Sequence, residues 1–229
     1  MLMDMYYIIL VLSAFIFSLF AQFKVTSIFR KYSDMPNNRY MTGAQASRML
    51  LDRHGLYDVG VEPVPGELTD HYDPRTKTVR LSESVYYSTS LAALGVAAHE
   101  TGHAVQHAAG YMPLVLRSSL VPVANIGSAV GPYLAMFGLM LNMPYLLQLG
   151  IILFIGAVAF YLITLPVEFN ASKRAIQMLK GEYVLNYAEV QPVKIVLGAA
   201  AMTYVASAAV AMANLIRLVL LAGSRDEEA

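Results

Sequence analysis

The stretch that decides the fold runs from Ala97 to Ala108 and reads AAHETGHAVQHA. It contains the pattern H-E-x-x-H, in which His99, Glu100 and His103 are the fixed positions. On a helix, residues four apart lie on the same face, so His99 and His103 would direct two imidazoles at one point. This spacing suits a tetrahedral zinc ion, whose bonds to histidine nitrogens are about 2.0–2.1 Å long. Glu100 lies about 100° around the helix, where it can take a proton from a water on the metal without binding the metal.

The flanking sequence favours a helix over residues 91–109. A serine or threonine within residues 88–90 can cap its start, the stretch contains no proline, and Gly110 can end it. Alanines before His99 and after His103 keep the surroundings apolar. The alternative is an ordinary buried helix with two incidental histidines. Because the flanks fit the motif, the pattern indicates metal-assisted hydrolysis.

The composition is that of a membrane protein with a modest soluble part. Of the 229 residues, 57% are hydrophobic and 14% are charged, whereas soluble domains carry about a quarter charged residues. The formal net charge is zero, so no nucleic-acid partner is expected. The chain has no cysteine. A metal must therefore be bound by histidine, carboxylate and water.

Apolar segments predict about four transmembrane helices. Residues 6–23 are long enough to cross a hydrocarbon core of about 30 Å. We expect a retained anchor rather than a signal peptide. The residues before this segment include Asp4 but no basic residue, and no clear cleavage site follows it. Segments near 118–141 and 145–166, joined by three uncharged residues, predict a transmembrane hairpin. Residues 193–221 are expected to form a fourth span or, alternatively, part of a cytoplasmic packing helix, and their small side chains permit a homo-oligomer.

Basic residues predict the orientation in the membrane. They follow the first span and the hairpin: Lys24, Arg30, Lys31, Arg39, Lys173, Arg174, Lys180 and Lys194. By the positive-inside rule both of these regions face the cytoplasm, and the N-terminus faces out. Whatever follows Pro166 is then on the same side of the membrane as His99.

These signals together predict a mainly α membrane protein with a zincin-like catalytic domain, a small β-hairpin and about four transmembrane helices. The expected parts, in chain order, are an N-terminal transmembrane anchor (1–23), a cytoplasmic zincin part with the H-E-x-x-H helix (24–113), a transmembrane hairpin (114–166), a cytoplasmic segment (167–190) and an alanine-rich C-terminal helix with its tail (191–229).

The polar part of the chain predicts a helix and a few short strands. The helix covers Thr42–Arg53, with Thr42 as its cap, and a strand over Val59–Glu62 is stopped by Pro63 and Pro65. A β-hairpin is expected over Leu68–Ser82, around a turn at Asp73-Pro74. Zinc peptidases often bind an extended substrate against such a strand. A purely structural hairpin is the alternative.

A catalytic zinc takes three protein ligands and one water, and Glu168 is the best candidate for the third ligand. It follows the returning span directly, on the side of His99, at the start of a short helix expected over Val167–Leu179 that stops at Gly181. The helix dipole also favours a glutamate at this position, which is the alternative reason for its presence. Pro192 is expected in the first turn of the next helix.

Four separated motifs resemble those of the YugP-type neutral zinc metallopeptidases of bacteria, which are small membrane proteins. They are HETGHAVQ at 99–106, DHYDP at 70–74, EFNASKRA at 168–175 and AAAMTYVA at 199–206. The resemblance covers nearly the whole chain. It implies a Zn²⁺ enzyme in which His99, His103 and Glu168 bind the metal and Glu100 is the catalytic base.

More distantly, the chain resembles the HtpX-like membrane gluzincins, in which an aspartate usually follows the ligand glutamate four residues later. That place holds Ser172 here. A weaker hydrogen bond to the metal-binding histidines is therefore expected from Asn170 or Ser172. His107, which lies one turn beyond His103, is expected to pack or hydrogen-bond beside the ligands rather than bind zinc.

Three further side chains are candidates for polarising the scissile carbonyl or stabilising the tetrahedral oxyanion: His71, Tyr72 and Arg174. Arg174 could instead pair with a carboxylate or a phospholipid.

The predicted function is an integral-membrane zinc endopeptidase of the bacterial plasma membrane. It would cleave a protein or peptide substrate at a cytoplasmic membrane surface, with Glu100 as general base. One alternative places the motif within the bilayer, but the helix that carries it begins in a polar region. The other is a non-enzymatic scaffold, a chaperone-like partner protein or a metal carrier. A scaffold has no use for a base at Glu100, and a carrier needs polar spans.

Overall fold

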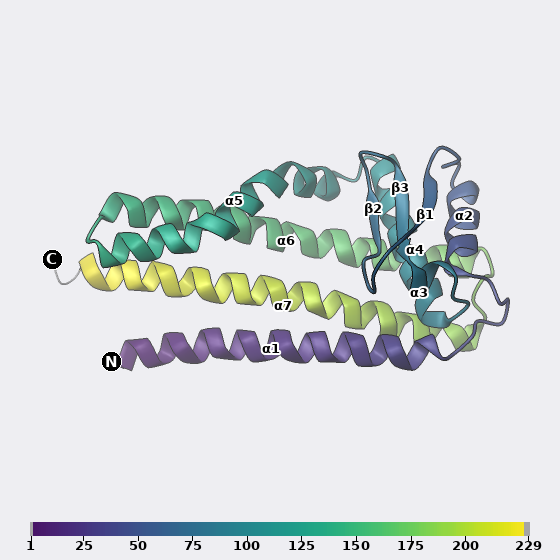
Figure 1. Cartoon of the computed structure of the whole chain (residues 1–229), viewed down its shortest axis with the longest axis horizontal. Coiled ribbons are helices and arrows are strands. Elements are labelled where there is room, and N and C mark those ends of the chain that lie inside the picture. The colour runs from purple at the N-terminus through teal and green to yellow at the C-terminus, as the bar shows by residue number, and fades with distance from the viewer. Residues whose placement is uncertain (1, 227–229) are drawn as a thin grey trace. The chain divides into compact units, whose positions relative to one another are not determined.

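The structure is a computed structural model that describes residues 2–226, with side chains from residue 8 to residue 223. Its elements (Figure 1) are α1 (Leu2–Ser33), α2 (Gly43–Arg53), β1 (Gly60–Val64), β2 (His71–Asp73), β3 (Thr78–Ser82), α3 (Glu83–Tyr86), α4 (Leu91–Ala108), α5 (Met112–Met140), α6 (Pro144–Gly181) and α7 (Tyr187–Asp226). The predicted mainly α fold is confirmed.

The chain forms two compact units. The helical unit comprises the described parts of residues 1–22, 115–166 and 203–229, and the mixed unit comprises residues 23–114 and 167–202. The helical unit is built from parts of α1, α5, α6 and α7. The mixed unit contains the sheet, α2, α3 and α4, together with the remaining parts of those four helices.

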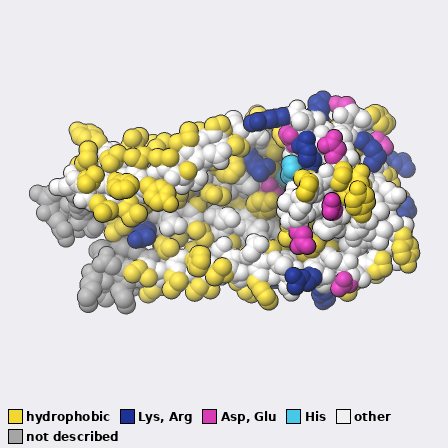
Figure 2. All heavy atoms as spheres, viewed as in Figure 1, with side chains coloured by type: hydrophobic (Ala, Val, Ile, Leu, Met, Phe, Trp, Pro, Cys, Tyr) yellow, Lys and Arg dark blue, Asp and Glu magenta, His cyan; other side chains and the backbone are white. Residues whose placement is uncertain are grey.

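Four helices are long and apolar enough to cross a membrane, namely α1, α5, α6 and α7. Many large apolar side chains of the helical unit are exposed, such as Ile126 and Ile152, which a lipid solvent accommodates and water does not. Figure 2 shows such hydrophobic side chains crowded along the helices. The predicted multi-pass membrane protein is therefore confirmed.

The helices α5 and α6 form a close hairpin within the helical unit. A Cβ atom on Gly127 would overlap the backbone of Leu153, and one on Gly150 would overlap the backbone of Ala135. Small residues let helix backbones approach in lipid, where packing rather than hydrophobicity drives association. The glycines thus set the spacing of this hairpin.

Two expected helix boundaries are wrong. The helix α6 continues without a break through Pro166, where a separate short helix was expected to begin, although its end at Gly181 is confirmed. Apolar surroundings favour an unbroken helix, because freed backbone groups would have no water to bind. The helix α7 begins at Tyr187, before Pro192. A capping box makes this start, in which Asn186 Oδ1 accepts from the backbone N–H of Glu189 and Glu189 Oε2 accepts from that of Asn186, both at 2.9 Å.

The sheet has the strand order β1-β3-β2. The strands β2 and β3 are antiparallel, which confirms the predicted hairpin, and β1 pairs with β3 in parallel. Of the two expected stops, the one at Pro65 is confirmed, because the strand ends at Val64 directly before it, and the one at Pro63 is wrong, because β1 runs through it. A proline is tolerated there because β1 is an edge strand, whose outward backbone groups need no partner strand.

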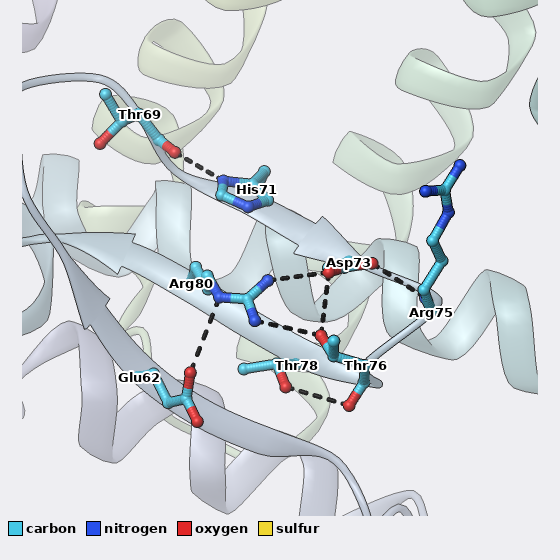
Figure 3. A network of polar contacts seen from close by, with 8 residues as sticks. All are labelled: Glu62, Thr69, His71, Asp73, Arg75, Thr76, Thr78 and Arg80. Atoms are coloured by element: carbon cyan, nitrogen blue, oxygen red, sulfur yellow. Dashed lines mark hydrogen bonds and ion pairs between the residues drawn. The ribbon is translucent and has the colours of Figure 1, made fainter. Parts of the chain in front are cut away.

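Arg80 ties the three strands together (Figure 3). Its guanidinium donates to Asp73 Oδ2 at 2.9 Å on β2 and lies 3.6 Å from Glu62 Oε2 on β1. Asp73 also accepts from the backbone N–H of Arg75 and the hydroxyl of Thr76. The hydrogen bond from Arg80, supported by the other two, holds the pKa of Asp73 well below its usual range.

Asp73→Asn is expected to lower the free energy of unfolding at neutral pH. The pKa of Asp73 is lower in the folded protein than in the unfolded chain, where it is near 3.8. Its carboxylate therefore stabilises the fold at pH values above 3.8, and this stabilisation is lost as the pH falls through the pKa of the folded protein. Because the Asp73 side chain is a quarter exposed, the difference should not exceed about 1 kcal/mol. Urea denaturation in detergent at several pH values measures it. A difference between wild type and variant that grows below pH 3 would contradict this assignment.

The helix α4 is the centre of the mixed unit, and most of its residues are buried. One side packs with Leu50, Leu179 and Val193, and another packs against Val79 and Leu81 of the sheet. The hydroxyl of its N-cap, Ser90, accepts from the backbone N–H of Ala93 at 3.1 Å. The predicted helix is confirmed, and its position fixes the side chains described next.

Candidate metal centre

Three buried side chains from two helices converge in the mixed unit. His99 and His103 lie on α4, with ring centroids 4.8 Å apart, and Glu168 lies on α6. Glu168 Oε2 is 3.1 Å from His99 Nε2 and 3.5 Å from His103 Nε2. The ligand atoms of the three residues all lie within 4.8 Å of one another. The structure therefore brings the three expected ligands together.

The donor set fits zinc. With bonds of about 2.0–2.1 Å, ligand atoms around a tetrahedral zinc are separated by about 3.3 Å. The 3.1 and 3.5 Å separations lie on either side of that value. Two imidazole nitrogens and one carboxylate oxygen are a known catalytic donor set, which leaves a fourth position open. Glu100 adds a second buried carboxylate, so the site has the negative charge that a divalent cation neutralises.

Hydrogen bonds orient both imidazoles. Gln106 Nε2 donates to the backbone carbonyl of Val167 at 2.8 Å, so its Oε1 is the atom that faces His103 Nδ1 at 2.9 Å. Because an amide oxygen only accepts, Nδ1 carries the proton and the lone pair of Nε2 is directed toward the cluster. His99 Nδ1 lies 3.1 Å from the Ser172 hydroxyl, which can act in the same way.

Gln106 contacts the cluster, although the sequence did not mark it as a candidate site residue. It is completely buried, and its Nε2 also donates to Asn170 Oδ1 at 3.0 Å, which in turn accepts from Arg174 Nε at 2.7 Å. Gln106 thereby ties α4 to the α6 backbone next to Glu168. The available signal was an uncharged polar residue that lies one turn after His103.

Gln106→Leu is expected to weaken zinc binding by about 10–100-fold, the usual effect of removing a partner that orients a ligand. Leucine has a similar volume but leaves His103 Nδ1 and the Val167 carbonyl without their hydrogen bonds. Competition with a chromophoric chelator measures the affinity. Gln177→Leu, at an exposed position of α6, is the matched control and should bind zinc like the wild type. An unchanged affinity in Gln106→Leu would show that His103 is oriented without it.

Gly102 allows α4 and α6 to approach at the site. A Cβ atom there would lie 2.8 Å from the carbonyl oxygen of Ala171. Such a contact is closer than real Cβ atoms make, so any side chain would push the histidines away from Glu168. The glycine between the two histidines is thus part of the geometry of the cluster.

Glu100 is buried beside the cluster and, among residues whose side chains the structure describes, makes no hydrogen bond or ion pair. Its charge acts on two neighbours. Burial raises the pKa of Asp70, the charge of Glu100 adds to this, and the hydrogen bonds from Ser82 oppose it. Burial lowers the pKa of His103, but the hydrogen bond to Glu168 and the charge of Glu100 outweigh it, and the net pKa is raised. A free carboxylate at this place suits a proton acceptor.

His107 faces the sheet, where its Nδ1 lies 2.8 Å from the Tyr72 hydroxyl on β2. Burial, followed by the charges of Asp58 and Asp73, raises the pKa of Tyr72 to about 12. Tyr72 therefore keeps its proton at neutral pH and can donate it to an acceptor.

The other predicted site residues differ in their placement. Ser172 contacts His99, and Asn170 is linked to His103 through Gln106. His71 is exposed, with its Nδ1 at 2.8 Å from the carbonyl of Thr69 (Figure 3). The hydrogen bond of Arg174 goes to Asn170.

Comparison with known proteins identifies the family. The family model described as "Putative neutral zinc metallopeptidase" matches residues 7–223. A relative named "Putative membrane protease YugP", from Bacillus subtilis (strain 168), is 51% identical over 224 residues, which are 97% of this chain and 100% of that protein. No solved structure matches the chain. The family is one of zinc enzymes, so the cofactor is Zn²⁺. The chain belongs to this neutral zinc metallopeptidase family, as its motifs predict.

Proposed function

We propose that the protein is an integral-membrane zinc endopeptidase of the bacterial plasma membrane, with its active site at the cytoplasmic surface. The observation that carries this proposal is the convergence of His99 Nε2, His103 Nε2 and Glu168 Oε2 beside the free, buried carboxylate of Glu100. The lysines and arginines that follow the first span and the hairpin support the cytoplasmic side.

The residues divide the chemistry between them. His99, His103 and Glu168 hold zinc, which when bound polarises the scissile carbonyl and lowers the pKa of the attacking water. Glu100 takes a proton from that water as its oxygen attacks the carbonyl carbon. When the C–N bond breaks, Glu100 passes the same proton to the leaving amine and returns to its ionised form.

The sheet offers a place for an extended substrate. β2 is the end strand of the order β1-β3-β2, so its outer edge pairs with no described strand. Tyr72 on this strand contacts His107, which follows His103 by one turn of α4. We propose that the substrate backbone adds along β2. The Tyr72 hydroxyl is then the best-placed donor for the scissile carbonyl or its oxyanion, and the exposed His71 contacts the substrate.

Metal removal tests the proposed function. The protein purified in detergent should contain zinc and cleave an unfolded model protein. A chelator should stop cleavage, and stoichiometric zinc should restore it. Cleavage that persists after zinc has been removed, or a preparation that binds no zinc, would overturn the proposal. Bound zinc without cleavage of any unfolded or membrane-anchored model protein would favour the scaffold.

A further inference from the structure

The helical unit contains a cavity of about 450 Å³ between its four helices. Apolar side chains from α5, α6 and α7 form most of the wall. The polar side chains that line it are Ser18, Ser128, Tyr161, Ser207, Asn214 and Arg217. The proposed chemistry of the metal centre makes no use of this cavity, so its role is independent of the proposed function.

Arg217 is the unusual member of this lining. It lies within the apolar span of α7 and, among residues whose side chains the structure describes, makes no hydrogen bond or ion pair. An arginine within a span is costly unless it finds a partner or reaches the interface. The side chain of Arg217 is exposed and lies six residues before Gly223, where this span ends. It can therefore reach the interface, where it needs a partner.

The neighbouring polar groups do not serve as that partner. The hydroxyl of Ser207 donates to the backbone carbonyl of Thr203 at 3.0 Å. The side-chain amide of Asn214 donates to the backbone carbonyl of Val210 at 2.9 Å. Both side chains thus bond within their own helix, and among the described residues neither forms a hydrogen bond with Arg217. None of the described residues that line the cavity is acidic, so the charge of Arg217 is left to attract an anion.

The size of the cavity restricts what can occupy it. A spanning helix about 30 Å long and 10 Å across has a volume on the order of 2,000 Å³, several times that of the cavity. A volume of about 450 Å³ is instead within the range of about 300–1,000 Å³ that is typical of pockets for small molecules. A single lipid chain fits this volume, and a transmembrane segment of a substrate does not.

We propose that this cavity binds one acyl chain of an anionic phospholipid, whose phosphate pairs with Arg217. The apolar wall accommodates the chain. The planar guanidinium can donate two parallel hydrogen bonds to phosphate oxygens. The site favours an anionic lipid over a zwitterionic one. A zwitterionic headgroup carries its own cation, which would lie beside the positive charge of Arg217 and repel it.

The absence of tryptophan from the chain permits a direct test. Phe154, which lines the cavity and is 6% exposed, is replaced by tryptophan as a reporter. The full-length protein is reconstituted in mixed phosphatidylglycerol and phosphatidylcholine vesicles in which one lipid or the other carries bromine, a quencher. We expect the reporter to favour phosphatidylglycerol about fivefold, the equivalent of roughly 1 kcal/mol for one basic residue.

Two controls make the test specific. Phe137→Trp, at an exposed position outside the cavity lining, should show a preference close to one. Arg217→Gln should reduce the Phe154→Trp preference to about one, while Arg217→Lys should retain part of it. Equal quenching by both lipids in the Phe154→Trp protein, or a preference that survives Arg217→Gln, would overturn the proposal. So would the absence of quenching by either lipid.

Discussion

Glu100→Gln is expected to abolish peptide cleavage while zinc remains bound at the wild-type level. Glutamine has nearly the same shape, so the packing around α4 should not change. Its amide cannot accept a proton from the attacking water. A general base contributes about 10²–10⁴-fold to the rate, so the residual rate should lie at least two orders of magnitude below that of the wild type.

The measurement pairs zinc content with cleavage of an unfolded model protein. Glu83→Gln, at an exposed position of α3 in the same unit, is the matched control and should cleave normally. Equal zinc in both variants, with cleavage only in the control, would support the assignment of the base. Cleavage by Glu100→Gln at the wild-type rate would show that another group accepts the proton, and Asp70 would be the first to examine.

Much of the α-helical framework can be predicted because each signal is local. The helix around His99 has its cap at Ser90, as its sequence indicates, and Thr42 caps α2 through a capping box with Gln45. The errors occur where tertiary context overrides a local rule. Pro166 lies within α6, where an apolar environment favours an unbroken helix. Pro63 lies within β1, where an edge strand tolerates a proline.

The candidate site follows a similar division. The spacing in H-E-x-x-H predicts that His99 and His103 share a helix face, and the order of the spans predicts that Glu168 returns to their side of the membrane. Local spacing cannot reveal which side chains contact the far nitrogens of the two imidazoles. Gln106 reaches both His103 and the α6 backbone, a contact that depends on how closely two helices approach at Gly102.

Glu168→Gln is expected to lose zinc as well as cleavage, in contrast to Glu100→Gln. The neutral amide is a poor zinc ligand, so only the imidazoles of His99 and His103 would bind the metal. In the wild type, Glu168 Oε2 lies within 3.5 Å of the Nε2 atoms of both histidines. The loss of affinity should exceed the roughly 100-fold that follows removal of an orienting hydrogen bond. Chelator competition and cleavage are measured on the same preparation.

The buried position of Glu168 requires a control for misfolding, since its carboxylate also joins α6 to α4. Glu182→Gln, which alters a more exposed carboxylate paired with Arg53, should leave zinc binding and cleavage intact. Glu168→Asp keeps the charge on a shorter side chain and should recover part of the zinc affinity if the fold is preserved. If Glu168→Gln is folded and binds zinc as tightly as the wild type, then Glu168 is not the third ligand. In that case Asp70, a partly buried carboxylate whose pKa is raised in part by the charge of Glu100, becomes the candidate, and the base and the ligand have to be assigned again from the sheet side of α4.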